Sequence, residues 1–507
     1  MQQRWKAVLS LETSKDIEGH RRTSKDIEGH RTFRMITVKD NQDRTPTVEE
    51  LKALRAKAVE THKAGRHVEA IGLYRQFLAR VPTDAAIWSN LGVAHRIRQE
   101  FDAAVACYMR ALEFKPNDSG FLSNLGNALK DLDQLDEALA AHSKAASIAP
   151  SDYNTRHNYG IALRDAGRFT ESLAEFAAAS RIDPNNANPR WDSAVSHLYL
   201  GDFAAGWAEY EWRWKIGEVE KRSSALPEWR GEDPGGRAIY FYPEQGFGDT
   251  LLAVRFLPWV KAQGAKVYLE CKAPLRRLFA ELDGVDELCD PAGPPPSDTA
   301  LQAPLMALPG LFRATLDNLP PPPRLSIPEA ARVRARSLMD PPDGRLRVGV
   351  IWSGSVTFKR NHKRSVGVER FMPLAHIPGV QLYSLQKGPR EGDLAEHGAA
   401  SVMIDLGARV EDFAETAACI EALDLVIMTD SSVAHLSGSL GRPVWNLLNY
   451  AAYWLYLWNR EDTPWYPSMR LIRQPKAGDW DSVFARVRDD LQRAAQRKRK
   501  GEHPFGH

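Results

Sequence analysis

Three short segments in the C-terminal half combine acidic, basic and hydroxyl side chains at points where strands are expected to end. The first, GFGD, places Asp249 at the start of a helix. Its carboxylate could cap that helix, or it could act as a general base that takes a proton from a hydroxyl group. The segment matches neither the dinucleotide-binding fingerprint nor the P-loop, because the later glycine or the Gly-Lys pair is missing.

The second segment, TDSSVAH, lies between a predicted strand and a predicted helix. The backbone amides of Ser431, Ser432 and Val433 would point out of the helix N-terminus, an arrangement suited to a diphosphate group. Alternatively, Asp430 or Ser431 only caps the helix. His435 falls one turn into the helix, where it is either a buried structural side chain or a contact to a ligand.

The third segment is a basic loop, SGSVTFKRNHKRS at 353–365, which follows another predicted strand. Such a cluster could neutralise a leaving diphosphate. It could equally be a solvated loop. Its basic side chains are Lys359, Arg360, His362, Lys363 and Arg364.

An aromatic stretch, NYAAYWLYLWN, follows the last of these segments. Tyr450 or Trp454 could supply a platform for a nucleotide base. The alternative is that the rings belong to the hydrophobic core.

Two series of strands alternating with helices must position these segments. The first holds AIYFY from Ala238, a helix from about Thr250 to Gln263, and the strand KVYLEC. The second holds RVGVIW from Arg347, QLYSLQ, DLVIMTD and PVWNLL. The pattern predicts two α/β lobes that face a cleft, with ligands at the carboxyl ends of the strands.

The N-terminal half repeats itself every 34 residues, as four prolines show: Pro82, Pro116, Pro150 and Pro184. In units framed by this period, the eighth position is always small: Ala58, Gly92, Gly126, Gly160 and Ala194. Bulky side chains share another phase: Tyr74, Tyr108, His142, Phe176 and Tyr210. A period of 34 with small residues at the helix crossings is typical of tetratricopeptide repeats, which stack as helical hairpins. We therefore predict an α-helical solenoid.

Identical amides stand at the sixth position of three units, Asn90, Asn124 and Asn158, and Asp192 takes this position in the fifth. Amide side chains offer donors and an acceptor to an extended peptide, so they could form a ladder for its backbone. The alternative is that they tie neighbouring turns together. In this respect the repeats resemble those of protein O-linked N-acetylglucosamine transferases, which use asparagines at this position, and the resemblance implies an acceptor peptide groove.

Composition excludes several classes of function. The 67 Lys and Arg residues against 65 Asp and Glu give a net charge of +2, so no global charge favours nucleic acid or acidic membranes. No apolar run suggests a membrane span or a signal peptide, and the four cysteines are widely separated, which fits a reducing cytoplasm. No Asp-X-Asp cluster stands at a strand end, so we expect no metal site and no cofactor.

Residues 237–491 resemble glycosyltransferase family nine, the heptosyltransferase-like enzymes of GT-B fold. Four stretches carry the resemblance: EQGFGDTLLAVRFLPWV, VGVIWSG followed by NHKRS, TDSSVAHLSGSLGRPVW, and REDTPWYPSMRLIRQP. The resemblance implies that Asp249 is the catalytic base and that Asp430 through His435 bind the sugar and diphosphate of the donor. It also implies that a basic residue of the middle loop stabilises the phosphates, for which Lys359 and Arg364 are the candidates.

We accordingly predict a TPR solenoid followed by a GT-B-like double Rossmann domain. The boundaries are a disordered segment at 1–44, the solenoid at 45–214, a linker at 215–236, an acceptor-side lobe at 237–340, a donor-side lobe at 341–491 and a disordered basic tail at 492–507. The aromatic segment GDFAAGWAEYEWRW at the end of the solenoid is expected to pack on the next domain.

The leading hypothesis is a cytoplasmic, metal-independent, inverting glycosyltransferase. It would move a sugar from a nucleotide-sugar to a hydroxyl of a protein recruited by the repeats, such as a bacterial flagellin-type protein. Two alternatives remain open at this point: an enzyme that acts on a glycan or lipid intermediate, and a repeat-containing adaptor whose transferase half has lost its chemistry.

Overall fold

The computed structural model describes residues 46–506 except 218, 341, 357 and 359. The expected disordered segment at 1–44 and the candidate Lys359 lie outside the described residues. The chain divides into two compact units, residues 1–53 and 54–507. The described part of the first unit is the beginning of a helix, α2.

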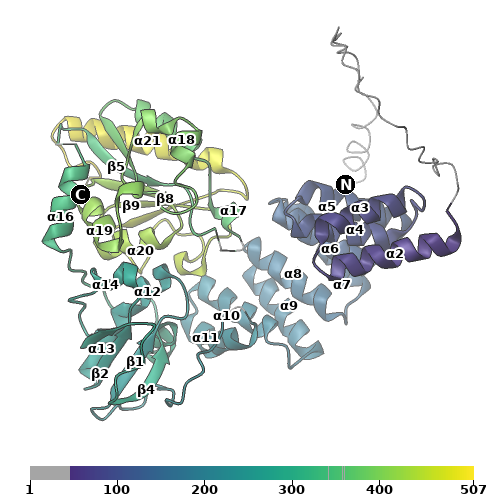
Figure 1. Cartoon of the computed structure of the whole chain (residues 1–507), viewed down its shortest axis with the longest axis horizontal. Coiled ribbons are helices and arrows are strands. Elements are labelled where there is room, and N and C mark those ends of the chain that lie inside the picture. Colours follow the sequence, from purple (N-terminus) through teal and green to yellow (C-terminus); the bar gives the residue numbers. More distant parts are fainter. Residues whose placement is uncertain (1–45, 218, 341, 357, 359, 507) are drawn as a thin grey trace, which may run out of the picture. The chain divides into compact units, whose positions relative to one another are not determined.

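Paired antiparallel helices form the N-terminal part of the chain (Figure 1). Each pair spans one 34-residue unit, and the last turn of the array tightens into a 3₁₀ helix, η1. The helices are α2 Val48–Lys63, α3 His67–Leu78, α4 Ala85–Ile97, α5 Phe101–Phe114, α6 Ser119–Asp131, α7 Leu135–Ile148, α8 Tyr153–Asp165, α9 Phe169–Ile182, α10 Asn188–Leu200, α11 Phe203–Glu209 and η1 Tyr210–Lys215.

Glycine allows the two helices of the second, third and fourth hairpins to approach closely, at Gly92, Gly126 and Gly160. A β-carbon on Gly126 would lie 2.6 Å from the ring of His142, and one on Gly160 would lie 2.5 Å from the ring of Phe176. The small eighth position is thus the space into which the bulky side chain of the partner helix packs. This contact explains why both positions keep their phase along the sequence.

A four-stranded parallel sheet follows, with strand order β3-β2-β1-β4. Its strands are β1 Ala238–Tyr242, β2 Lys266–Glu270, β3 Glu287–Cys289 and β4 Thr299–Pro304. The helices of this region are α12 Phe247–Ala253, η2 Val254–Phe256, α13 Leu257–Ala262, α14 Ala273–Arg276, η3 Leu305–Ala307, α15 Leu308–Leu311 and α16 Glu329–Leu338. The prediction of a single helix from Thr250 to Gln263 is wrong. The helical segment begins earlier, at Phe247, and consists of three pieces, α12, η2 and α13. Pro258 stands in the first turn of α13, where the missing backbone N–H would have no partner within the helix.

A six-stranded parallel sheet forms the last part, with strand order β10-β9-β8-β5-β6-β7. Its strands are β5 Leu346–Ile351, β6 Val380–Ser384, β7 Met403–Asp405, β8 Leu425–Thr429, β9 Val444–Leu448 and β10 Met469–Arg473. Its α-helices are α17 Asn361–Arg364, α18 Asp393–Glu396, α19 Phe413–Glu421, α20 Ser432–Ser439 and α21 Trp480–Arg499. Two parallel sheets with helices agree with the predicted α/β architecture.

The expectation of a disordered basic tail at 492–507 is wrong for its first half. Helix α21 continues to Arg499 and buries Leu491, Ala494 and Ala495 against the six-stranded sheet. The basic side chains of the last turns conceal this apolar face in the sequence.

The end of the helical array shares a hydrophobic core with the four-stranded sheet. Phe203 and Trp207 are buried in the same cluster as Ile239 and Phe241 of β1, and the indole N–H of Trp207 donates to the carbonyl of Ala314 at 3.2 Å. Trp212 and Trp214, which we expected to pack in the same way, stay half-exposed. Among the described helices, none has the length and apolar composition that a membrane crossing requires.

Candidate functional site

The three segments with candidate site residues, GFGD, TDSSVAH and the basic loop, lie at the switch points of the two sheets. GFGD follows β1, the strand from which the four-stranded sheet extends in both directions, toward β2 and toward β4. The basic loop follows β5 and the TDSS turn follows β8, two strands that are hydrogen-bonded neighbours in the six-stranded sheet. Parallel sheets bind ligands at such points, because the loops leave in opposite directions and open a crevice.

The segments line one cavity of about 1160 Å³. The predicted residues Asp249, Arg364, Asp430, Ser431, Ser432, Val433 and His435 all contribute to its wall. The repeat array also contributes, through Asp133, Leu135, Asp165 and Tyr199. A volume of this size accommodates a nucleotide-sized ligand.

Asp249 is held at the start of α12 in a poorly hydrated position. Its carboxylate accepts hydrogen bonds from the amide of Gly246 at 3.1 Å and from the hydroxyl of Tyr453 at 3.3 Å. Burial raises the pKa of this carboxyl to about 6, although both hydrogen bonds favour the charged form. Asp249 therefore does cap the helix, and its pKa also suits proton transfer near neutral pH.

Glu244 is a second buried carboxyl of the cavity wall, and the sequence reasoning did not single it out. Desolvation raises its pKa to about 7, while the buried guanidinium of Arg213, 3.5 Å away, opposes the rise. The amide of Met306, just after β4, donates to it at 3.4 Å. Glu244 thus joins the loop after β1 to the loop after β4 and to the end of the repeat array.

The turn after β8 begins a helix whose N-terminus opens on the cavity. Ser431 is the N-cap, and its hydroxyl accepts from the amide of Val433 at 3.3 Å. Asp430 does not cap the helix: it accepts from the hydroxyl of Tyr456 at 2.6 Å and lies 3.4 Å from the guanidinium of Arg364. The two predicted donor-side residues Asp430 and Arg364 are therefore ion-paired.

His435 stands where the two α/β halves meet. Burial lowers its pKa to about 4, and its Nδ1 lies 3.1 Å from the hydroxyl of Tyr466. A β-carbon on Gly248 of α12 would lie 2.8 Å from the imidazole. His435 is therefore a neutral, buried side chain that packs against the backbone of the GFGD turn, as the structural interpretation predicts, and it also lines the cavity.

The basic loop is not simply solvated. Arg360 and Lys363 form ion pairs with two carboxylates of the repeat array, Asp165 and Asp133. The ring of His362 packs against that of Phe101, with 5.6 Å between the ring centroids. Sequence reasoning missed these repeat residues.

Of the two aromatic candidates, only Tyr450 lines the cavity. Trp454 is buried and packs in the core against Trp207 and Phe203. The core alternative thus holds for Trp454.

The three asparagines of the repeats lie on the first helices of successive units, half-buried. The amide of Asn124 donates to Ser89 at 3.5 Å, and that of Asn158 donates to Ser123 at 3.1 Å, in each case one repeat earlier. Both also line a hollow of about 400 Å³ on α6 and α8, whereas Asn90 does not. Two of them therefore tie neighbouring repeats together and still border an open surface.

No group of three or more His, Cys, Asp or Glu side chains in the described part of the chain is placed to hold a metal ion.

Parts of the chain are similar to known proteins. Residues 85–118 and 107–140 match two family models, both described as tetratricopeptide repeat. The protein FlbA of Caulobacter vibrioides is 28% identical over 318 residues, which cover 57% of this chain and 52% of FlbA. The chain thus spans about half the length of this curated relative.

Solved repeat structures are similar at a lower level. They include "MamA MSR-1 C2" (24% identity, TM-score 0.29, 33% of this chain and 97% of that one), MamA from Desulfovibrio magneticus RS-1 (18%, 0.30, 33% and 93%) and YrrB, "a TPR protein with an unusual peptide-binding site" (21%, 0.28, 32% and 82%).

The N-terminal helices are therefore a tetratricopeptide-repeat array, a class of structure that serves protein interaction. The C-terminal part is an α/β region of two parallel sheets with one shared cavity.

Proposed function

We propose that this protein is a glycosyltransferase of the GT-B type, related to family nine, which moves a sugar from a nucleotide-sugar to a hydroxyl of a protein bound by the repeats. The observation that carries the proposal is the cavity of about 1160 Å³, whose wall combines Asp249, the N-terminus of α20 and side chains of the repeat array. A donor site, a base and an acceptor-binding arm would thus meet in one space.

The donor diphosphate would lie at the N-terminus of α20. The amides of Ser431 and Ser432 stand at the positive end of the helix dipole, where the amide of Val433 already donates to the Ser431 hydroxyl, and Arg364 supplies a guanidinium. Asp430 would keep Arg364 oriented, because its carboxylate is itself fixed by Tyr456. This arrangement can neutralise the leaving group without a metal ion, and the reaction needs no cofactor beyond the nucleotide-sugar.

The base would be Asp249. Its carboxylate takes the proton of the acceptor hydroxyl while the hydroxyl oxygen forms a bond to the anomeric carbon. The bond from that carbon to the diphosphate oxygen breaks, and the nucleoside diphosphate leaves with the electron pair. Attack from the face opposite the leaving group inverts the anomeric centre, as the resemblance to family nine implies.

His435 would act as a neutral group beside the donor. Its pKa of about 4 keeps the imidazole uncharged at the pH where the Asp249 carboxylate is available. It would contribute a hydrogen bond and the packing of the two halves, and the charge on the diphosphate side would come from Arg364 and from α20.

The acceptor would be a polypeptide in an extended conformation along the first helices of the repeats. Asn124 and Asn158 border the hollow there and offer amide groups that do not depend on the sequence of the peptide. We place the reaction in the cytoplasm, in keeping with four cysteines that are all buried thiols.

A thermal-shift screen of the full chain with UDP, GDP, ADP, CMP and their sugars tests the proposal. A nucleotide that binds the native state raises the melting temperature, by an amount that corresponds to about 2.7 kcal/mol at one hundred times its Kd. We expect one base to stand out and its sugar conjugate to be hydrolysed or transferred slowly. An unchanged melting temperature with every compound would contradict the proposal.

A further inference from the structure

The basic loop after β5 is anchored on the repeat array by two ion pairs. The guanidinium of Arg360 lies 3.2 Å from Asp165 at the end of α8. The ammonium of Lys363, in α17, lies 2.7 Å from Asp133 and donates to the carbonyl of Lys130 at 2.6 Å. Lys363 is largely removed from solvent, with 14% of its side chain exposed. Asp133 lies in the turn after α6, and Asp165 is the last residue of α8.

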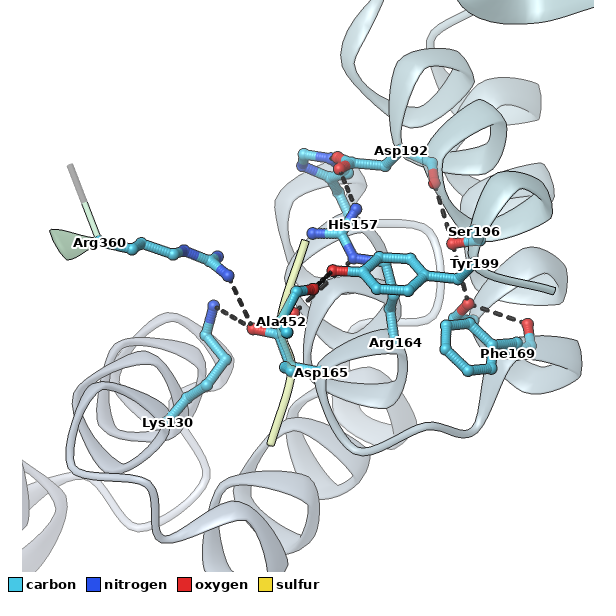
Figure 2. A network of polar contacts seen from close by, with 12 residues as sticks. Lys130, His157, Arg164, Asp165, Phe169, Asp192, Ser196, Tyr199, Arg360 and Ala452 are labelled. Atoms are coloured by element: carbon cyan, nitrogen blue, oxygen red, sulfur yellow. Dashed lines mark hydrogen bonds and ion pairs between the residues drawn. The ribbon is translucent and has the colours of Figure 1, made fainter. Parts of the chain in front are cut away.

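A buried polar network holds Asp165 in place (Figure 2). The ammonium of Lys130 lies 3.6 Å from its carboxylate, and Arg164 lies 3.7 Å away. Burial alone would raise the pKa of Asp165, but these cations together with Arg360 hold it well below its usual range. Asp165 is thus a charged and desolvated anchor. Removal of one of its cationic partners would leave a buried charge unmatched.

The same face of the repeats meets the aromatic stretch after β9. The amide of Trp458 donates to the carbonyl of Tyr199 at 3.1 Å. The Trp458 ring fills the space beside Gly167, where a β-carbon would lie only 2.2 Å from it. The contact between the array and the α/β region is therefore shaped by close packing as well as by charge.

The anchored loop carries Arg364, the donor-side cation. Lys363 and Arg364 are adjacent in α17, a single helical turn. Asp430 orients the Arg364 side chain itself, whereas the ion pairs of Arg360 and Lys363 fix the short element that carries it. The anchors of the loop and Asp430 thus together determine where Arg364 stands relative to α20.

We propose that the repeat array is part of the donor site, with Asp133 and Asp165 as positioning residues that hold the basic loop and Arg364 in place for the diphosphate. This inference rests on the proposed function and extends it, because the repeats then serve both substrates. Loss of a repeat carboxylate then weakens nucleotide binding through the loop, even though a carboxylate in the cavity wall would by its own charge repel the diphosphate.

Asp133→Asn is the sharpest test. Asp133 has a positive φ of 61°, which asparagine tolerates well, so the substitution removes the charge and leaves the turn unstrained. Loss of one partly buried, charge-assisted contact should raise the Kd of the nucleotide about three- to tenfold. Asp136→Asn, at an exposed position of the neighbouring helix α7, is the matched control and should bind like the wild type.

Two measurements on the full chain separate positioning from a general loss of structure. Calorimetry with UDP, GDP, ADP and CMP gives the Kd, and hydrogen exchange reports protection of residues 360–364. We expect Asp133→Asn to exchange faster in this loop, with unchanged protection of the β8 core. The double variant with Lys363→Gln should add little, because both changes break the same pair.

The outcomes distinguish the two proposals. If the wild type binds none of the four nucleotides, the proposed function fails, and this inference fails with it. If the wild type binds one of them and Asp133→Asn binds it equally well, with unchanged exchange in the loop, only the positioning role is refuted.

Discussion

Asp249→Asn should move activity and stability in opposite directions. The asparagine keeps the size of the side chain and can still accept one hydrogen bond from Gly246 or Tyr453. It removes the negative charge from a poorly hydrated position, and it cannot take a proton. A purely structural capping residue would lose stability on this change, whereas a carboxylate whose charge is desolvated would gain it.

The magnitude follows from the raised pKa of the carboxyl. Its pKa rises from 3.8 to about 6, and one unit corresponds to about 1.4 kcal/mol, so ionised Asp249 costs the folded state about 3 kcal/mol. Because the folded pKa is the higher one, the contribution of the carboxyl to stability is complete below pH 4 and is lost as the pH rises through 6. With one hydrogen bond weakened, we expect a net gain of about 1–2 kcal/mol at pH 8.

The catalytic consequence is larger. Removing a general base should lower turnover by about 10² to 10⁴, with nucleotide affinity nearly unchanged. In the wild type, kcat/KM should fall as the pH drops below about 6, because protonated Asp249 cannot accept the proton of the acceptor.

Nucleotide release, calorimetry and urea denaturation at pH 4 and pH 8 measure the three effects. Asp283→Asn, an exposed position in the same part of the chain, serves as the control. An unchanged turnover would remove Asp249 as the base. A loss of stability at pH 8 would refute the reasoning from its pKa.

Three further changes test other parts of the account. Replacing Asn124 and Asn158 together with alanine should weaken binding of an acceptor polypeptide and lower stability by about 1 kcal/mol per lost inter-repeat hydrogen bond, with unchanged nucleotide affinity by calorimetry; a selective loss of nucleotide binding would contradict this. Gly248→Ala should destabilise the chain by about 1–3 kcal/mol, because the new β-carbon would lie 2.8 Å from the buried ring of His435. An unchanged or higher melting temperature would contradict this close packing of α12 on α20. Trp207→Ala should cost about 3–5 kcal/mol and broaden the melting transition, since Trp207 joins the array to the four-stranded sheet; an unchanged melting curve would show that the two fold independently.

The repeats could be predicted from sequence because their signal is local and recurs in phase. Gly126 and His142 lie 16 residues apart, and each repeat presents the same pair of a small and a bulky side chain. Six of the ten strands in the described part of the chain were predictable for a similar reason, as short apolar runs ending at glycine or polar residues. The other four, β3, β4, β7 and β10, were not predicted.

The pairing of charges could not be predicted in the same way. Arg360 and Asp165 are separated by 195 positions, and nothing in the spacing of the basic loop indicates a partner in the repeats. Only the folded chain shows that Arg364 is paired with Asp430. The candidate residues were therefore identifiable one by one, whereas their electrostatic environment depends on tertiary contacts.

The asparagines illustrate a different limit. Their recurrence predicted a shared role, and two roles were open: contact with a peptide, or a tie between neighbouring turns. Asn158 forms the tie to Ser123 and also borders the hollow on α6 and α8, so an amide can serve both. The sequence does not distinguish the roles, because the same residue type satisfies each.

The most direct test of the central claim is the intact mass of an acceptor protein. The full chain is incubated with the nucleotide-sugar selected by thermal shift and with a candidate polypeptide such as a flagellin-type protein. The intact mass of the polypeptide is then measured by mass spectrometry. The account predicts an increase by one or more sugar residues that Asp249→Asn abolishes. No increase on any candidate polypeptide, with the nucleotide-sugar bound and Asp249 intact, would contradict it.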